Sequence, residues 1–190
     1  GVLNTAGSYT ILGNVTFSGT MTSSPLTNTG GITFSGSSTI TSNSVVVKCP
    51  ITISGGSLTL NDNFTQDSTG AGGLFPLFTL TSGSFVLNNF TASLCSFSSS
   101  NSNARTVNYG TSGRIVIPTV NGTFFDVTTA TNFTTSGTPL VDLSTTVGSK
   151  NIVTGFDSIQ ALSYPVSTTG SSGFKLSTSA SSTTGLTGSY

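Results

Sequence analysis

The chain has 190 residues, a formal net charge of zero and charged residues at only 5% of its length. Histidine, tryptophan and glutamate are absent. Without histidine, Ser-His and Cys-His nucleophiles and most zinc sites are excluded, and the scattered basic residues do not form the cluster that a nucleic-acid surface needs. No stretch reaches the roughly 20 apolar residues that span a bilayer. We therefore expect no enzymatic activity, no nucleic-acid partner and no membrane span.

Serine and threonine make up about 37% of the chain, a bias that by itself favours disorder. Threonine, however, alternates with Ile, Val, Leu and Phe, and most of the 13 Phe lie within these alternating runs. Alternation with β-branched and aromatic residues is typical of strands. The pattern therefore predicts a folded, all-β chain.

A short theme recurs along the first half: an apolar-Thr-apolar-Ser strand, a glycine turn and a second short strand. Its copies begin at Val15, Ile32, Ile51 and, more loosely, Phe78. Self-similarity at a spacing of roughly 17 to 27 residues indicates stacked units. We predict a parallel β-helix (β-solenoid) of short stacked coils. The alternative is a β-sandwich or jelly roll, in which hairpins close two sheets.

The second half continues with strands predicted at 114–117, 123–127, 139–143 and 151–153. Polar insertions at 66–73 and 98–105 leave the regular path and are expected to protrude. After residue 164 the chain is mostly Ser, Thr and Gly. The predicted organisation is a solenoid domain over 1–164, followed over 165–190 by a cap, a linker or a partner-binding tail.

Residues 77–97 carry a more specific resemblance. Short apolar strands around Phe78 and Phe85 precede the corner Asn88-Asn89, and a further short strand ends at Phe97. This segment resembles a coil of the pectin-lyase-like right-handed parallel β-helix, as used in polymorphic-membrane-protein repeats and autotransporter-type passengers. The resemblance covers residues 12 to 97 at the level of architecture. Lyases of this fold use clustered Asp beside a basic residue, which this chain lacks, so the resemblance implies a surface protein.

The two cysteines, Cys49 and Cys95, are candidates for one disulfide in an oxidising compartment. With a coil of about 23 residues they lie two coils apart, or ~9.6 Å at the ~4.8 Å strand spacing. That separation exceeds the ~7 Å Cα limit for a bridge. Irregular coils would bring the cysteines closer, so a disulfide and two buried thiols both stay open.

Two patterns suggest catalysis only weakly. Asp126 and Asp142 each lie in an apolar strand and would form a carboxylate pair if they stacked on adjacent coils; the simpler interpretation is that both face water. Ser172 and Lys175 match the Ser-x-x-Lys spelling of acyl-enzyme nucleophiles within a serine-rich tail, where chance explains the match. We predict no catalytic residues and no cofactor.

One polar cluster offers oxygen ligands for calcium: Asn61, Asp62, Asn63, Gln66 and Asp67. Its spacing matches no calcium-binding repeat, and an Asx-rich turn accounts for the same residues. We therefore predict no metal site.

Five Asn-x-Ser/Thr sequons are candidate glycosylation sites, at Asn14, Asn63, Asn89, Asn121 and Asn132. About five sequons are expected at random in this composition, so their number is uninformative. The side chains of Asn14, Asn89 and Asn132 are predicted to point outward.

The composition, rich in Thr, Ser, Asn and Gly and poor in Lys, indicates an extracellular, cell-surface or virion-surface protein. Because a chain without net charge lacks self-repulsion, we predict a structural subunit of a surface layer, fibre or appendage. It would assemble with itself or other surface subunits through β-edges and coil ends. The alternative is an adhesin that binds a host receptor or glycan through loops 65–73 and 98–105. A lesser alternative is an ice-binding solenoid with a Thr-x-Thr ladder through Thr20, Thr39, Thr59 and Thr79.

Overall fold

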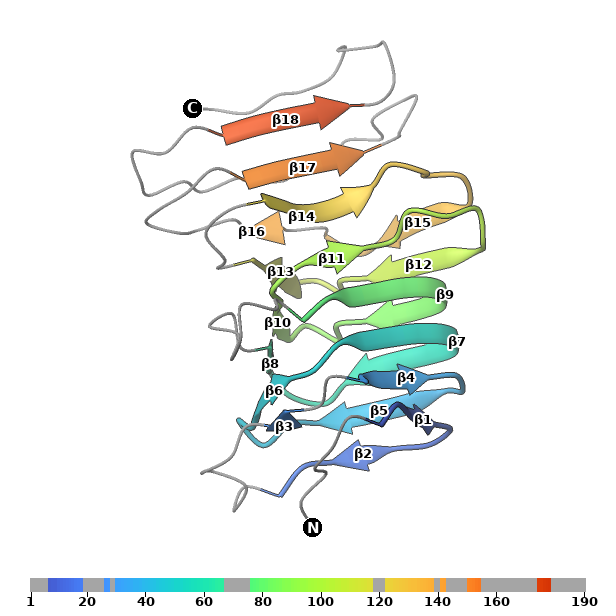
Figure 1. Ribbon diagram of the computed structural model, residues 1–190, viewed down its shortest axis with the longest axis vertical. Coiled ribbons are helices and arrows are strands. Elements are labelled where there is room, and N and C mark those ends of the chain that lie inside the picture. Colours follow the sequence, from blue (N-terminus) through green and yellow to red (C-terminus); the bar gives the residue numbers. More distant parts are fainter. Residues whose placement is uncertain are drawn as a thin grey trace.

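A computed structural model describes residues 7–18, 26–27, 30–66, 76–117, 122–138, 141–142, 150–154 and 174–178. These residues contain strands and no helix. Figure 1 shows the strands stacked one above another along the long axis, with the earliest strands at one end and the latest at the other. Every described strand pair is parallel. The fold is therefore the predicted parallel β-solenoid, and the sandwich and jelly-roll alternatives are wrong.

Each complete coil has three sides. Side one contains β1 (Tyr9–Ile11), β4 (Ile32–Phe34), the first limbs of β7 (Ile51–Leu60) and β9 (Phe78–Val86), β11 (Phe97–Ser98), β14 (Gly122–Val127), β17 (Lys150–Thr154) and β18 (Phe174–Thr178). Side two contains β2 (Val15–Thr16), β5 (Ser38–Thr41), the second limbs of β7 and β9, β12 (Arg105–Asn108) and β15 (Phe133–Ser136). Side three is a separate sheet of β3 (Leu26–Thr27), β6 (Val46–Lys48), β8 (Phe64–Gln66), β10 (Thr91–Ser93), β13 (Arg114–Val116) and β16 (Val141–Asp142).

Coil length varies along the stack. The shortest coils on side one have 19 residues, from Ile32 to its register partner Ile51, and the longest has 28, from Phe97 to Phe125. Because pairing resumes in register after each coil, the extra residues of a long coil lie in its loops. The repeat is therefore one of position in the coil, not of sequence spacing.

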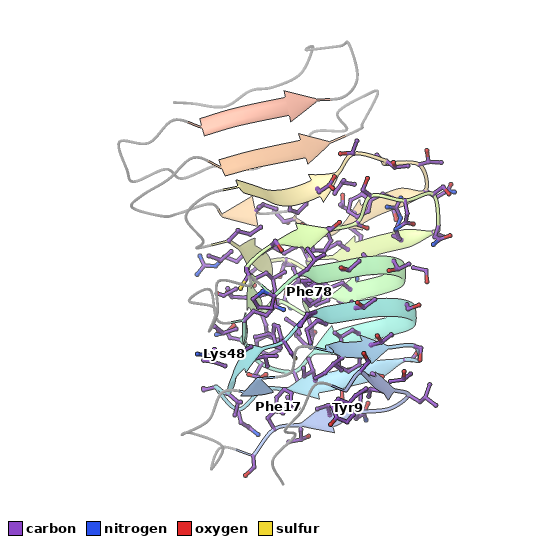
Figure 2. All side chains as sticks on the ribbon, in the orientation of Figure 1. Tyr9, Phe17, Lys48 and Phe78 are labelled. Carbon is purple, nitrogen blue, oxygen red and sulfur yellow. The ribbon has the colours of Figure 1, made fainter. Side chains whose placement is uncertain are left out.

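The interior is a column of apolar side chains supplied by alternate residues of each strand. On side one, Ile32, Ile51, Phe78, Phe97 and Phe125 are successive register partners, and all are buried. The Phe78 and Phe97 ring centroids lie 6.2 Å apart, and those of Phe97 and Phe125 5.0 Å apart. Figure 2 shows Phe78 among the side chains that fill the interior, whereas Lys48 lies at the flank. Burying one such side chain contributes about 1.5–3 kcal/mol.

Glycines of the sequence theme form the corner between sides one and two, where successive coils approach closely. A Cβ atom on Gly83 would lie 2.2 Å from the backbone oxygen of Gly56 on the preceding coil, and Gly83 has a φ of +86°. A Cβ on Gly56 would in turn lie 2.4 Å from the carbonyl carbon of Gly36. Only glycine fits such a position, which explains why the Ser-Gly pairs recur.

The first copy of the theme is out of phase with the others. Val15 and Thr16 pair with Ile40 and Thr41 on side two, whereas the later copies stack on side one. The residues that align with Ile32 and Phe34 are Tyr9 and Ile11, which lack a following Ser-Gly. The prediction that residue 15 begins the first side-one strand is therefore wrong.

Most strands predicted for the second half are present as β13, β14, β16 and β17. Within the predicted tail, β18 pairs in parallel with β17 and extends side one. The remainder of residues 165–190 lies outside the described part of the chain.

Candidate functional site

The polar residues gather at the corner between sides two and three, which we call the Asx corner and define by Asn43, Asp62, Asn63, Asn88 and Asn89. Asn43, Asn88 and Asn89 have positive φ values of 49°, 50° and 69°, a conformation that Asn tolerates better than most residues. Their side chains bond between coils: the Asn43 amide donates to the Phe17 carbonyl at 2.6 Å, and the Asn88 amide donates to the Leu60 carbonyl at 3.2 Å. The corner therefore turns the chain and joins coils at once.

The carboxylate of Asp62 is occupied within this corner. Its two oxygens accept hydrogen bonds from the backbone N–H groups of Ser42 at 2.7 Å and Asn43 at 2.6 Å. Gln66 is 1% exposed, and its amide donates to the Cys49 carbonyl at 3.1 Å. Asp67 lies outside the described residues. Within those residues no group of three or more His, Cys, Asp or Glu could hold a metal ion, so the Asx-turn interpretation fits the cluster.

Three candidate glycosylation asparagines belong to the same inter-coil bonding. The Oδ1 atoms of Asn14, Asn63 and Asn89 accept hydrogen bonds from the backbone N–H groups of Thr39 at 2.9 Å, Thr91 at 2.9 Å and Thr111 at 2.7 Å. Each bond reaches the next coil. Asn14, Asn89 and Asn132 are exposed, as predicted. Asn121 lies outside the described residues.

The sequon spelling itself follows from the coil. In Asn63-Phe64-Thr65 the Asn sits at the corner, Phe64 is buried in the interior and Thr65 faces outward. Asn132-Phe133-Thr134 repeats this order, and there the Asn132 amide donates to the Ser102 carbonyl at 2.9 Å. A corner Asn, an inward apolar residue and an outward Thr therefore produce the sequon without any requirement for a glycan.

A buried arginine fastens the two longest coils, and the sequence analysis did not identify it. Arg105 is 1% exposed. Its Nε donates to the Asn103 carbonyl at 2.8 Å, its Nη1 donates to the Ser99 carbonyl, and its Nη2 donates to the carbonyls of Thr129 at 3.1 Å and Thr131 at 2.6 Å. Burial lowers the pKa of this guanidinium. We call this arrangement the Arg105 cage.

One signal in the sequence marks the Arg105 cage. Arg105 precedes Val107 and Tyr109 at the same alternation, and both of those side chains are buried. A charged residue at an inward position of a strand requires hydrogen-bonding partners. The guanidinium also lies 5.6 Å from the centroid of the Phe133 ring, within the range of a cation–π contact.

The insertion at 98–105 does not stand free of the body, contrary to the prediction that it protrudes. Ser99 is fully buried, and its hydroxyl donates to the Leu80 carbonyl at 2.9 Å. The Asn103 amide donates to the Thr81 carbonyl at 3.0 Å, and Thr129 N–H donates to the Ser100 hydroxyl at 3.0 Å. The loop is thus bonded to the coils on both sides. Of the other predicted binding loop, residues 67–73 lie outside the described residues.

The two cysteines are buried thiols, and no bridge joins them. Each precedes a side-one strand by two residues, and those strands are two coils apart, because Ile51 pairs with Phe78 and Phe78 with Phe97. Pro76, which is buried, occupies the equivalent place in the coil between. Burial raises the pKa of Cys49 to about 12. The structure therefore has the two-thiol arrangement.

The predicted carboxylate pair does not form. Asp126 lies on side one, in register with Ser98 and Val153, whereas Asp142 lies on side three, in register with Val116. The 16 residues between them lead around one coil to another side. Of the predicted Ser-x-x-Lys pair, Ser172 lies outside the described residues and Lys175 lies in β18.

The predicted threonine ladder is also differently arranged. Thr39 and Thr59 are register partners on side two, but Thr79 pairs with Thr52 on side one. Thr10, Thr33, Thr52 and Thr79 instead form a continuous column on side one. Thr20 lies outside the described residues. The expected 20-residue spacing placed threonines of two different sides in one ladder.

Comparisons with protein-family models, with curated proteins and with solved structures find no match. The fold itself defines a class: the chain is an all-β parallel β-solenoid. Among the described residues, no helix has the length and apolar character needed to cross a membrane.

Proposed function

We propose that this chain is a non-enzymatic structural subunit of an extracellular or virion surface layer, fibre or appendage. One observation carries the proposal: the polar side chains that would otherwise suggest chemistry bond one coil to the next. Asp62, Asn63, Asn89 and Arg105 all do so. A solenoid held in this way is a rigid rod whose sides carry hydroxyl and amide groups and few charges.

Self-association is the mechanical part of this proposal. In the described part of the chain, β1 and β18 each pair on one side only, and a strand edge that is not covered tends to pair with another chain. The formal net charge of zero removes long-range repulsion between copies. We expect light scattering on the purified chain to show a mean mass that rises with concentration. A strictly monomeric chain at every concentration would contradict the proposal.

The location is tested separately. Antibody labelling and protease shaving of intact cells or particles are expected to detect the chain at the outer surface. Detection only after lysis would exclude this location. The resemblance to pectin-lyase-like surface proteins is part of the same proposal, supported by the three-sided coils and the Asn-rich corner, and an experimental structure with right-handed coils would strengthen it.

The adhesin alternative receives less support, because the loop proposed to bind a receptor or glycan is bonded into the stack through Ser99, Asn103 and Arg105. Deleting residues 98–105 would remove the Arg105 cage and so could not separate binding from folding. A sharper test is Asn101→Lys, which changes the loop surface. Loss of cell or glycan binding with unchanged thermal stability would favour adhesion over a purely structural role.

The side-one column gives the ice-binding alternative its one specific observation. Thr10, Thr33, Thr52 and Thr79 repeat in register, at the ~4.8 Å spacing of neighbouring strands. Thermal hysteresis tests this function. If the column binds ice, Thr52→Lys should abolish hysteresis, whereas Thr59→Lys, on the other limb of the same strand, should retain it. Absence of hysteresis in the unmodified chain would end this alternative.

A further inference from the structure

The edge that β1 presents is set by backbone hydrogen bonding. Tyr9 N–H donates to the Gly31 carbonyl at 3.1 Å, and Ser35 N–H donates to the Ile11 carbonyl at 3.1 Å. Tyr9 and Ile11 therefore direct their backbone groups toward β4. In a parallel ladder alternate residues bond to opposite neighbours, so the N–H and C=O of Thr10 between them point away from β4, toward the end of the solenoid.

The described part of the first coil, residues 7–18, lacks the usual protection of a strand edge. It contains no charged residue and no proline, two features that commonly block edge pairing. Leu12, at the corner between β1 and β2, is 75% exposed, the largest exposed fraction among the large apolar side chains of the described residues. A chain docked against this coil would gain backbone hydrogen bonds and would cover Leu12.

The direction of the strands decides which occupant fits. Every described pair in the stack is parallel, from β1 with β4 to β17 with β18. Two copies related by a two-fold axis through their β1 edges would place those strands antiparallel. Continuation of the parallel ladder requires the opposite end of a second copy, where β18 is the last described strand and pairs with β17 alone among the described strands.

We propose that this chain assembles head to tail, with the β1 edge of one copy adding in parallel to the β18 edge of the next, so that side one continues from copy to copy. Such an interface uses two different surfaces and does not close on itself, and interfaces of this kind produce open filaments. The inference rests on the proposed structural function and specifies its interface: a polar filament with coils stacked along its axis, rather than a closed dimer.

The test compares the full chain with two variants of Thr10, whose side chain is exposed. Thr10→Pro removes the outward N–H without removing a bond to β4, and proline is tolerated on edge strands. Thr10→Val keeps the N–H and serves as the matched control. Circular dichroism first establishes that both variants are folded, and light scattering and negative-stain microscopy then measure assembly.

We expect the unmodified chain and Thr10→Val to form rods whose mean mass grows with concentration without a plateau, and Thr10→Pro to stay at the 19.1 kDa of one chain. Thr10→Pro retains its C-terminal edge, so adding it to the unmodified chain should cap growth and shorten the rods. A plateau at two copies would overturn the head-to-tail arrangement while leaving self-association intact. Assembly of Thr10→Pro equal to that of the control would exclude the β1 edge, and a monomeric unmodified chain would overturn the proposed function as well.

Discussion

The lower coils, from β4 to β9, and the upper coils, from β11 to β15, solve the same problem by different means. The lower coils have short corners, and successive strands are fitted together by glycines such as Gly56 and Gly83. In the upper coils, longer loops lead from side one to side two, and the single side chain of Arg105 bonds four carbonyl groups from both loops. Repetition stabilises the first region, and one specific residue stabilises the second.

Replacing Arg105 should have the largest effect, because it would break the upper region at one point. Arg105→Met leaves the carbonyls of Asn103, Ser99, Thr129 and Thr131 without their donor, and we expect a loss of about 4 kcal/mol, the range for breaking a buried polar network. Chemical denaturation measures the loss. Arg105→Lys should recover less than half, since an ammonium cannot match a planar fork.

Arg114→Met is the control for this substitution. Arg114 is exposed and makes a 3.2 Å hydrogen bond to the Thr91 hydroxyl, so its loss should cost less than about 0.5 kcal/mol. Hydrogen exchange should localise the Arg105→Met effect to residues 98–104 and 128–132. Equal destabilisation by both variants would show that the cage has no special role.

A substitution in the lower region should have the next largest effect. Gly83→Ala places a Cβ 2.2 Å from the Gly56 oxygen at a φ of +86°, and we expect a loss of about 3 kcal/mol from strain and displacement of the coil. Gly13→Ala is the matched control, since a Cβ there meets nothing within 4 Å. Thermal unfolding compares the two. A Gly83→Ala protein as stable as Gly13→Ala would contradict the close-approach explanation.

A smaller effect is expected at the Asx corner. Asp62→Ala removes the acceptor for the N–H groups of Ser42 and Asn43, and these groups are partly accessible to water. We therefore expect about 1–2 kcal/mol, as for loss of a helix cap. Denaturation and hydrogen exchange at residues 42 and 43 measure this cost. Unchanged protection of both amides would show that the carboxylate does not hold the corner.

The smallest effect at neutral pH concerns Cys49, whose pKa is raised from 9.0 to about 12 by burial. The folded state favours the neutral thiol, so its contribution to stability is fully present below pH 9 and is lost as the pH rises toward 12. Cys49→Ala should flatten this part of the stability profile. Native Cys49 should also resist alkylation at pH 8 and react after unfolding; rapid labelling of the native chain would contradict its burial.

The lower coils could be predicted because their sequence repeats. Ile51-Thr52-Ile53 announces an alternating strand, and the glycines that follow mark the corner. The first coil could not be placed, because Tyr9-Thr10-Ile11 has the alternation without the glycines, while the Val15 segment copies the theme on a different side. Linear spacing does not distinguish the three sides of a coil, which is why Asp126 and Asp142, or Thr59 and Thr79, were assigned to shared columns that they do not share.

The site residues show the same limit. Asn63 and Asn89 read as sequons in isolation, and their bonds to Thr91 and Thr111 become visible only when the coils are stacked. The Arg105 cage depends on carbonyls 24 and 26 residues away, whose convergence no local pattern encodes. Its inward position was readable from the alternation with Val107, but its partners were not.

Because strand pairing joins each coil only to the coils directly above and below it, the molecule has a characteristic response to tension. A load applied between its ends would detach the outermost coil first and release 19 to 28 residues of slack per event. The peak force is then set by one coil boundary at a time, and adding coils lengthens the tether without strengthening it. The boundary fastened by Arg105 is where such unravelling should pause.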